Sequence, residues 1–241
     1  MKIKNFIEQR NKRPFKLCSL AGFVCLTFIT PFMSTWFINK KYSPNSITMM
    51  MLITGLVFGI IMLIPNIMLK LLCFGGFLLW FSFDCSDGEV ARFTKVFSKY
   101  GKQLDWMAHL VCHPLFVIGM WKTICDFYPN FNNVSFTVFS MLFLAVEINH
   151  RNIVAITNMN DESFDLYPTT QVCSWYKAFL IYVKTQIAYF PNLVVFCPLF
   201  VFVDYVFEIY VFPYIYIAWG IIYFVYAIKE FVASLKIMYK T

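Results

Sequence analysis

Charged side chains are scarce in this sequence: they make up 14% of its 241 residues, against roughly 25% in an average soluble domain. The chain also lacks any polar or low-complexity stretch long enough to fold outside a membrane, and 60% of its residues are apolar. These two shortages exclude a soluble enzyme, a disordered tail and a nucleic-acid binder as leading interpretations. The 29 Phe and 14 Tyr residues suit lipid-facing helices with aromatic belts.

Metal-binding cysteine motifs are also missing. The chain has eight Cys residues, but no two of them have the Cys-x-x-Cys spacing that structural zinc and iron–sulfur sites use. Most lie inside apolar runs, as Cys18, Cys25, Cys73, Cys112 and Cys197 do. We therefore interpret them as small buried apolar residues rather than as a disulfide framework.

Long apolar windows are what the sequence has instead. A transmembrane helix needs about 20 apolar residues. Windows 46–69, 127–146, 185–203 and 209–228 contain no Asp, Glu, Lys or Arg, and windows 71–83 and 106–121 become long enough if flanking polar residues belong to the helix ends. Turn-forming residues separate consecutive windows at 65–66, 93–102, 128–133 and 203–212. The pattern predicts six transmembrane helices.

Residues 17–39 form a further uncharged stretch with basic residues on both flanks. Because basic flanks favour the same side of the membrane for both ends, we predict a helix that lies in the interface and is kinked near Pro31. A seventh span remains the alternative. The predicted fold class is therefore an all-α integral membrane protein, with six transmembrane helices preceded by an N-terminal juxtamembrane interfacial helix.

The basic residues indicate the orientation. With six spans, most Lys and Arg residues fall on one side, which the positive-inside rule makes the cytoplasmic side, together with both termini. We expect residues 1–241 to form a single membrane domain, with the basic N-terminus and juxtamembrane helix at 1–41 and the six-helix core at 46–238.

Four ionisable residues lie at the edges of two neighbouring spans. Asp84 and Asp87 end one apolar run and are three residues apart, while Asp105 and His109 open the next and are four apart. Each pair shares a helix face, so two facing helices would bring the side chains together. Such groups are costly at the edge of a membrane and are usually functional. Three converging carboxylates need a hard divalent cation, and oxygen ligands favour Mg²⁺ or Mn²⁺.

The segment from 84 to 109 reads DCSDGEVARFTKVFSKYGKQLDWMAH. It closely resembles the signature of the CDP-alcohol phosphotransferases, integral membrane enzymes with the pattern DxxDGxxARx(8)GxxxDxxxD. Every spacing agrees, and the difference is at the last position, where His109 replaces Asp. SPNSIT at 43–48 also resembles the PNxxT segment that begins the first span of that family.

The resemblance implies a six-helix fold with a polar cavity facing the cytoplasm, usually in a homodimer. It implies that Asp84, Asp87 and Asp105 ligate one or two Mg²⁺ or Mn²⁺ ions, which would bind the pyrophosphate of a CDP-linked donor. The residues implied in nucleotide and donor binding are Asn45, Asp84, Asp87, Gly88, Ala91, Arg92 and Gly101.

His109 stands where the family has its general base. An imidazole can accept a hydroxyl proton at neutral pH, so we expect His109 to act as the base beside Asp105, with weaker binding of a second metal because one negative charge is lost. His113, one turn further, is interpreted as helix packing before Pro114. Candidate acceptor-binding residues are Arg151, Lys177 and Lys184, although interfacial roles are equally open for them.

The leading hypothesis is a metal-dependent transferase of phospholipid or envelope glycolipid synthesis. It would move a phospho-alcohol group from a CDP-linked donor to an alcohol acceptor and release CMP, with membrane lipids and a second copy of the chain as partners and no nucleic acid. One alternative is an inactive relative that only binds nucleotide. The other is a transporter, which would place carboxylates throughout the bilayer depth within inverted repeats.

Overall fold

The computed structural model describes residues 3–11, 20–159 and 190–238, and every regular element in these ranges is helical. This confirms the all-α fold class. The elements are α1 (Ile3–Asn11), α2 (Leu20–Val24), the π-helix η1 (Cys25–Ile29), α3 (Thr30–Asn39), α4 (Pro44–Ile61), α5 (Ile67–Thr94), α6 (Gly101–Phe127), the 3₁₀ helix η2 (Pro129–Phe131), α7 (Val134–Met159), α9 (Phe190–Phe207) and α10 (Phe212–Met238).

Six helices of the described part are long and apolar enough to cross a membrane, which makes the chain a multi-pass integral membrane protein. These are the continuous stretch Leu20–Asn39, α4, α5, α6, α9 and most of α10. The number agrees with the prediction, but the set differs in two members. Leu20–Asn39 qualifies by length and composition, whereas α7 does not, because it begins at Val134, inside the predicted window 127–146, and then includes Glu147 and Arg151.

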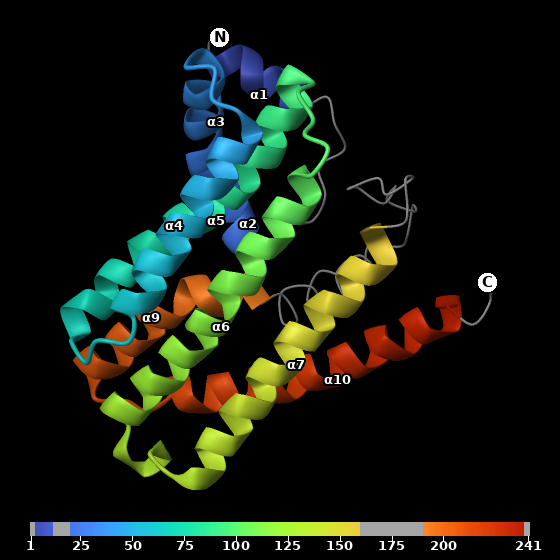
Figure 1. The fold of residues 1–241 in the computed structure, drawn as a ribbon. Coiled ribbons are helices and arrows are strands. Elements are labelled where there is room, and N and C mark those ends of the chain that lie inside the picture. The colour runs from blue at the N-terminus through green and yellow to red at the C-terminus, as the bar shows by residue number, and fades with distance from the viewer. Residues whose placement is uncertain (1–2, 12–19, 160–189, 239–241) are drawn as a thin grey trace, which may run out of the picture.

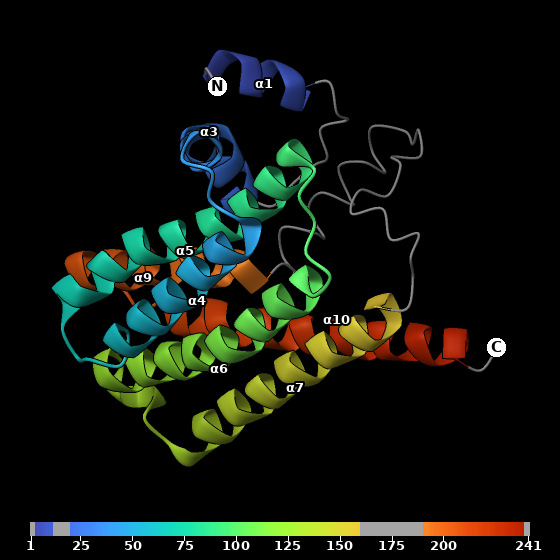
Figure 2. The same ribbon diagram turned by 45° about the horizontal axis from the view of Figure 1, so that its top comes forward.

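The orientation of α3 bears on the choice between an interfacial helix and a span. In Figure 2, α3 is seen almost end-on while α4, α5 and α6 extend across the view, so α3 crosses these helices steeply. Phe28, Phe32 and Trp36 repeat every four residues and form an exposed aromatic face. Ser34 is buried and donates to Glu89 Oε2 on α5 at 2.7 Å. This arrangement fits an interfacial helix, and η1 lies at the expected irregularity just before Pro31.

The break between the first two core helices lies where the sequence placed it. Asn66 caps α5 by accepting hydrogen bonds from the backbone N–H groups of Met68 at 2.9 Å and Leu69 at 3.2 Å. From there α5 runs for 28 residues, or about 42 Å, which exceeds the ~30 Å hydrocarbon thickness. The polar residues that flank the apolar window thus belong to the helix, as predicted.

Close packing of α4 places the ends of three helices together. A side chain at Gly55 would overlap Cys112 on α6, and one at Gly76 on α5 would overlap the Phe58 ring on α4. These glycines let the backbones approach closely, as small residues do between membrane helices. In Figure 1 the start of α4, the end of α5 and the start of α6 lie at one end of the bundle, the end at which α1 lies.

Candidate active site

Side chains from α5 and α6 converge at this end. His109 Nε2 on α6 lies 2.9 Å from Asp84 Oδ1 on α5 and 3.5 Å from Asp105 Oδ1, one turn earlier on α6. The three atoms all lie within 4.8 Å of one another. The helix spacing explains the placement, because residues four apart on α6 point to the same side and α5 faces that side.

The three side chains differ in access to solvent. The side chain of Asp105 is 41% exposed, whereas those of Asp84 and His109 are 19% and 10% exposed. Even so, Asp105 Oδ1 itself is buried and accepts no hydrogen bond from the described part of the chain. Two carboxylate oxygens and one imidazole nitrogen that face each other form a suitable donor set for a divalent cation. The residues present therefore fit a metal ion.

Asp87 is directed away from this group, toward α4. Its Oδ2 accepts a 2.6 Å hydrogen bond from Thr48 Oγ1, and its Oδ1 accepts one from the Gly88 backbone N–H. Both Thr48 and Asp87 are buried. Sequence reasoning did not single out Thr48, although it is the last residue of the SPNSIT segment. The structure links the two motif segments through this contact.

Two other motif residues pack on each other beside Asp87. A Cβ on Gly88 would lie 2.9 Å from Arg92 Nη1, so the guanidinium group covers the glycine backbone. Ala91 lies on the same helix, between them in sequence, and is partly buried. The absence of a side chain at Gly88 is therefore what lets the Arg92 charge lie close to the carboxylate segment.

The first turn of α4 meets the first turn of α6. Asn45 Nδ2 donates to Ser98 Oγ at 3.1 Å, and Asn45 Oδ1 lies 3.7 Å from the position that a Cβ on Gly101 would take. The residues expected to bind nucleotide thus come from α4, α5 and α6 and lie at the same end of the bundle as the carboxylates.

A family model described as CDP-alcohol phosphatidyltransferase matches residues 41–207, more than half of the chain. The chain belongs to this family. The matched range contains every motif residue described above. A search among curated proteins found no match. Members of the CDP-alcohol phosphatidyltransferase family transfer a phospho-alcohol group from a CDP-alcohol, which confirms the resemblance seen in the sequence.

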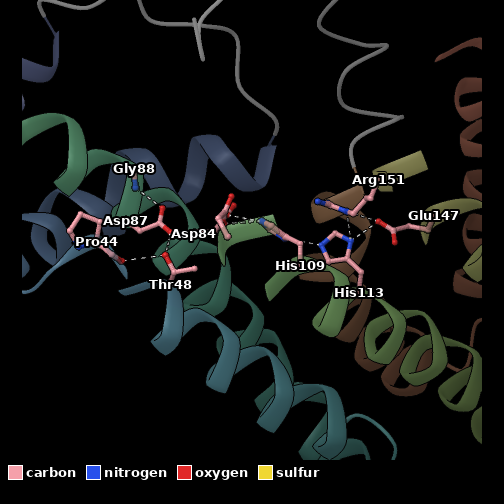
Figure 3. A network of polar contacts seen from close by, with 10 residues as sticks. Pro44, Thr48, Asp84, Asp87, Gly88, His109, His113, Glu147 and Arg151 are labelled. Atoms are coloured by element: carbon pink, nitrogen blue, oxygen red, sulfur yellow. Dashed lines mark hydrogen bonds and ion pairs between the residues drawn. The ribbon is translucent and has the colours of Figure 1, made fainter. Parts of the chain in front are cut away.

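A second group of polar side chains extends from His109 toward α7 (Figure 3). His109 is the residue that replaces the last Asp of the family signature. His109 Nδ1 lies 3.1 Å from His113 Nε2, and His113 Nδ1 lies 2.6 Å from Glu147 Oε1 on α7. Arg151 Nε donates to Glu147 Oε1 at 2.7 Å. His113 and Glu147 are fully buried. His113 is thus hydrogen-bonded, which the interpretation as helix packing missed; its spacing of four from His109 was the available signal.

Of the three candidate acceptor-binding residues, the structure describes only Arg151. Arg151 lies in this inner group, with its Nε engaged by Glu147 and its backbone carbonyl accepting from Trp106 Nε1 at 3.4 Å. Lys177 and Lys184 lie outside the described residues.

Proposed function

We propose that this family member transfers a phospho-alcohol group from a CDP-linked donor to the hydroxyl group of an alcohol acceptor and releases CMP, in phospholipid or envelope glycolipid synthesis. The observation that carries the proposal is the convergence of Asp84 Oδ1, Asp105 Oδ1 and His109 Nε2 at the end of α5 and α6. This end also carries Gly88, Arg92 and the other residues that match the family signature.

His109 is proposed as the general base. Its Nε2 would take the proton of the acceptor hydroxyl, and the oxygen would attack the β-phosphorus of the donor. The bond from this phosphorus to the bridging oxygen of the pyrophosphate breaks, and CMP leaves with the electron pair. Arg92 would offset negative charge on the phosphates, since its charge is fixed at neutral pH.

Asp84 and Asp105 are the proposed ligands of Mg²⁺ or Mn²⁺, together with Asp87, whose carboxylate would have to turn from Thr48 and the Gly88 N–H to reach the ion. The bound ion would neutralise the carboxylates and stabilise charge on the pyrophosphate. Asp105 Oδ1 supports this assignment, because it accepts no hydrogen bond from the described residues and a cation stabilises such a buried carboxylate oxygen. His109 Nε2 lies in the same group and could instead ligate the ion. His109 can therefore be the general base or a metal ligand, and Asp105 lies beside its Nε2 in either role.

Several broader expectations complete the proposal. Asn45 and Gly101 would bind the nucleotide together with Gly88 and Ala91. Arg151, Lys177 and Lys184 remain candidates for the acceptor, the site and both termini would face the cytoplasm, and the protein would act as a homodimer. We propose residues 1–241 as one domain, since the family match spans most of the helical core.

The test is CMP release by the purified protein in nanodiscs with Mg²⁺ or Mn²⁺. CDP-diacylglycerol, CDP-choline and CDP-ethanolamine would each be offered against a panel of alcohol acceptors. Asp84→Asn and His109→Ala are the site variants. Asp126→Asn is the matched control, because Asp126 also lies on α6 but pairs with Lys122 near the other end of that helix.

Metal-dependent CMP release that both site variants abolish and the control retains would establish the transferase and its donor class. Metal-dependent binding of a CDP-linked donor without release across the panel would support an inactive relative instead. Absence of nucleotide binding would overturn the proposal.

A further inference from the structure

We propose that Glu147 and His113 are positioning residues that hold the His109 ring through its Nδ1–H, so that Nε2 faces Asp84 and Asp105. The inference deepens the proposed function and rests on it, because it explains how a histidine can serve at the position where the family signature has Asp. It begins at the buried end of the hydrogen-bonded chain.

Glu147 determines which atom holds the proton that it shares with His113. Its Oε1 accepts the N–H of Arg151 at 2.7 Å, and the adjacent guanidinium charge keeps the carboxylate ionised. An ionised carboxylate can only accept hydrogen bonds. The proton between Glu147 Oε1 and His113 Nδ1, which are 2.6 Å apart, therefore belongs to Nδ1 of the histidine.

Arg151 Nε also lies 2.9 Å from His113 Nδ1, but the carboxylate is closer, at 2.7 Å, and its charge makes it the stronger acceptor of the single N–H. A second proton on His113 would put a positive charge beside Arg151 on a fully buried ring, which is unfavourable. His113 is therefore neutral, and its Nε2 carries a lone pair.

The role of His109 Nδ1 is then fixed. Because His113 Nε2 can only accept, His109 Nδ1, 3.1 Å away, must donate. His109 Nε2 thus faces Asp84 Oδ1 at 2.9 Å and Asp105 Oδ1 at 3.5 Å. A proton or a metal ion between Nε2 and the carboxylates satisfies all three atoms. A histidine ligand or base is commonly oriented in this way through its other nitrogen.

The surroundings of His113 hold it in place. The ring stacks on Phe190 of α9 with centroids 4.5 Å apart, and the Trp80 ring of α5 lies near both imidazoles, at 5.7 Å from His109 and 5.8 Å from His113. Four helices thus fix a pair of rings near the middle of α6. Ionisable groups at such depth are costly and are retained for function, which argues against simple helix packing.

The tautomers can be measured directly in metal-free protein by ¹⁵N NMR of labelled histidine. The chain has three His residues, so a His150→Gln background leaves only the two rings of interest. Glu147→Met removes the acceptor and frees Arg151 Nε to donate to His113 Nδ1. Both rings should then carry their proton on Nε2. Glu147→Gln keeps an oxygen acceptor and serves as the conservative rescue, while Asn149→Met changes an exposed residue of the same helix.

We expect Nδ1–H on both rings in the His150→Gln background and in Glu147→Gln, and Nε2–H on both in Glu147→Met. The kcat for CMP release should fall about 100- to 10,000-fold in Glu147→Met, the range that general-base catalysis supplies, with the donor KM within about twofold. Glu147→Gln should lose about tenfold or less, and Asn149→Met should match the background.

A His109 Nδ1 that carries no proton in the background protein, or tautomers unaffected by Glu147→Met, would overturn the inference. The tautomer measurement needs no activity, so it separates the two proposals. Absence of CMP release together with Nδ1–H on both rings would refute the proposed function and leave the positioning intact, whereas release together with a His109 Nδ1 that carries no proton would do the reverse.

Discussion

Helix α6 has a polar cluster near each end, and the two clusters are built in opposite ways. Within its first turns, two carboxylate oxygens and the His109 Nε2 atom face one another. Just past its last residue, Tyr128 OH donates to Asp204 Oδ2 at 2.8 Å, and the same oxygen accepts the backbone N–H groups of Val211 at 3.0 Å and Phe212 at 2.7 Å. In the first cluster two carboxylates share one imidazole nitrogen, whereas in the second a single carboxylate oxygen accepts from three donors.

The difference separates a binding site from a structural contact. Burial, followed by the hydrogen bond to Asp204, raises the pKa of Tyr128 well above its usual value, so the hydroxyl stays a donor and the turn between α9 and α10 is fixed. No such compensation exists for Asp105 Oδ1 among the described residues. An acidic residue at the end of an apolar helix is therefore a functional candidate only where the donors are missing.

The largest expected effect is at Asp84. Asp84→Asn should lower CMP release by about 1,000-fold, because it removes a proposed ligand of the metal ion that would stabilise transition-state charge. The same change relieves repulsion between acceptors, so the apparent unfolding temperature of metal-free protein should stay constant or rise. Activity assays in nanodiscs and thermal unfolding followed by Trp fluorescence check both parts. A clear drop in the unfolding temperature would mean that the cluster is structural after all.

At the cluster around Asp204, just past the other end of α6, we expect a loss of stability without a loss of kcat. Asp204→Ala leaves the Tyr128 hydroxyl and two backbone N–H groups without an acceptor, and should destabilise the fold by about 3 kcal/mol. The kcat of the remaining folded protein should be unchanged, since Tyr128, which contacts Asp204, lies 19 residues or about 28 Å of helix length from His109. The unfolding temperature and the kcat per folded molecule are the measurements. Lower kcat with unchanged stability would contradict the division between the two clusters.

Much of the fold could be predicted because hydrophobic length is a local property. Window lengths and turn residues were sufficient to place the breaks around Asn66 and at 128–133, and to assign polar flanks to α5 and α6. The extension of α7 past Glu147 could not be predicted, because one partner of its buried carboxylate, His113, comes from α6. The orientation of α3 likewise depends on contacts such as Ser34 with Glu89, which span 55 residues.

The candidate site could also be predicted only in part. The signature spacing on α5 and α6 was sufficient to select Asp84, Asp105 and His109, whose possible metal-ligating atoms converge. Roles that depend on a third helix were missed: Thr48 reaches Asp87 from α4, and Glu147 reaches His113 from α7. Spacing within a helix can be read along the chain, whereas the choice between two neighbouring helices is made only by packing.

An intermediate effect is expected from His109→Asp, which adds a charge to the cluster of acceptors. A unit charge 4 Å from a cation contributes about 1 kcal/mol at the dielectric constant of water and about 4 kcal/mol at a value of 20. The half-saturating Mg²⁺ or Mn²⁺ concentration should therefore fall about tenfold or more, with CMP release preserved. Metal titrations of both proteins provide the measurement. An unchanged half-saturation would indicate that Nε2 of His109 already acts as a ligand of comparable strength.

The smallest expected effect lies at the contact that joins α4 to the site. Thr48→Val keeps the side-chain shape but removes the hydroxyl that donates to Asp87 Oδ2 at 2.6 Å. Losing this hydrogen bond should lower CMP release about fivefold, or roughly 1 kcal/mol. Thr48→Ser restores the donor and should recover the activity. Because Thr48 is buried, the unfolding temperature of both variants must also be followed. If Thr48→Val lost stability but kept its kcat, Asp87 would belong with Asp204 as a structural carboxylate, and the site would be confined to Asp84, Asp105 and His109.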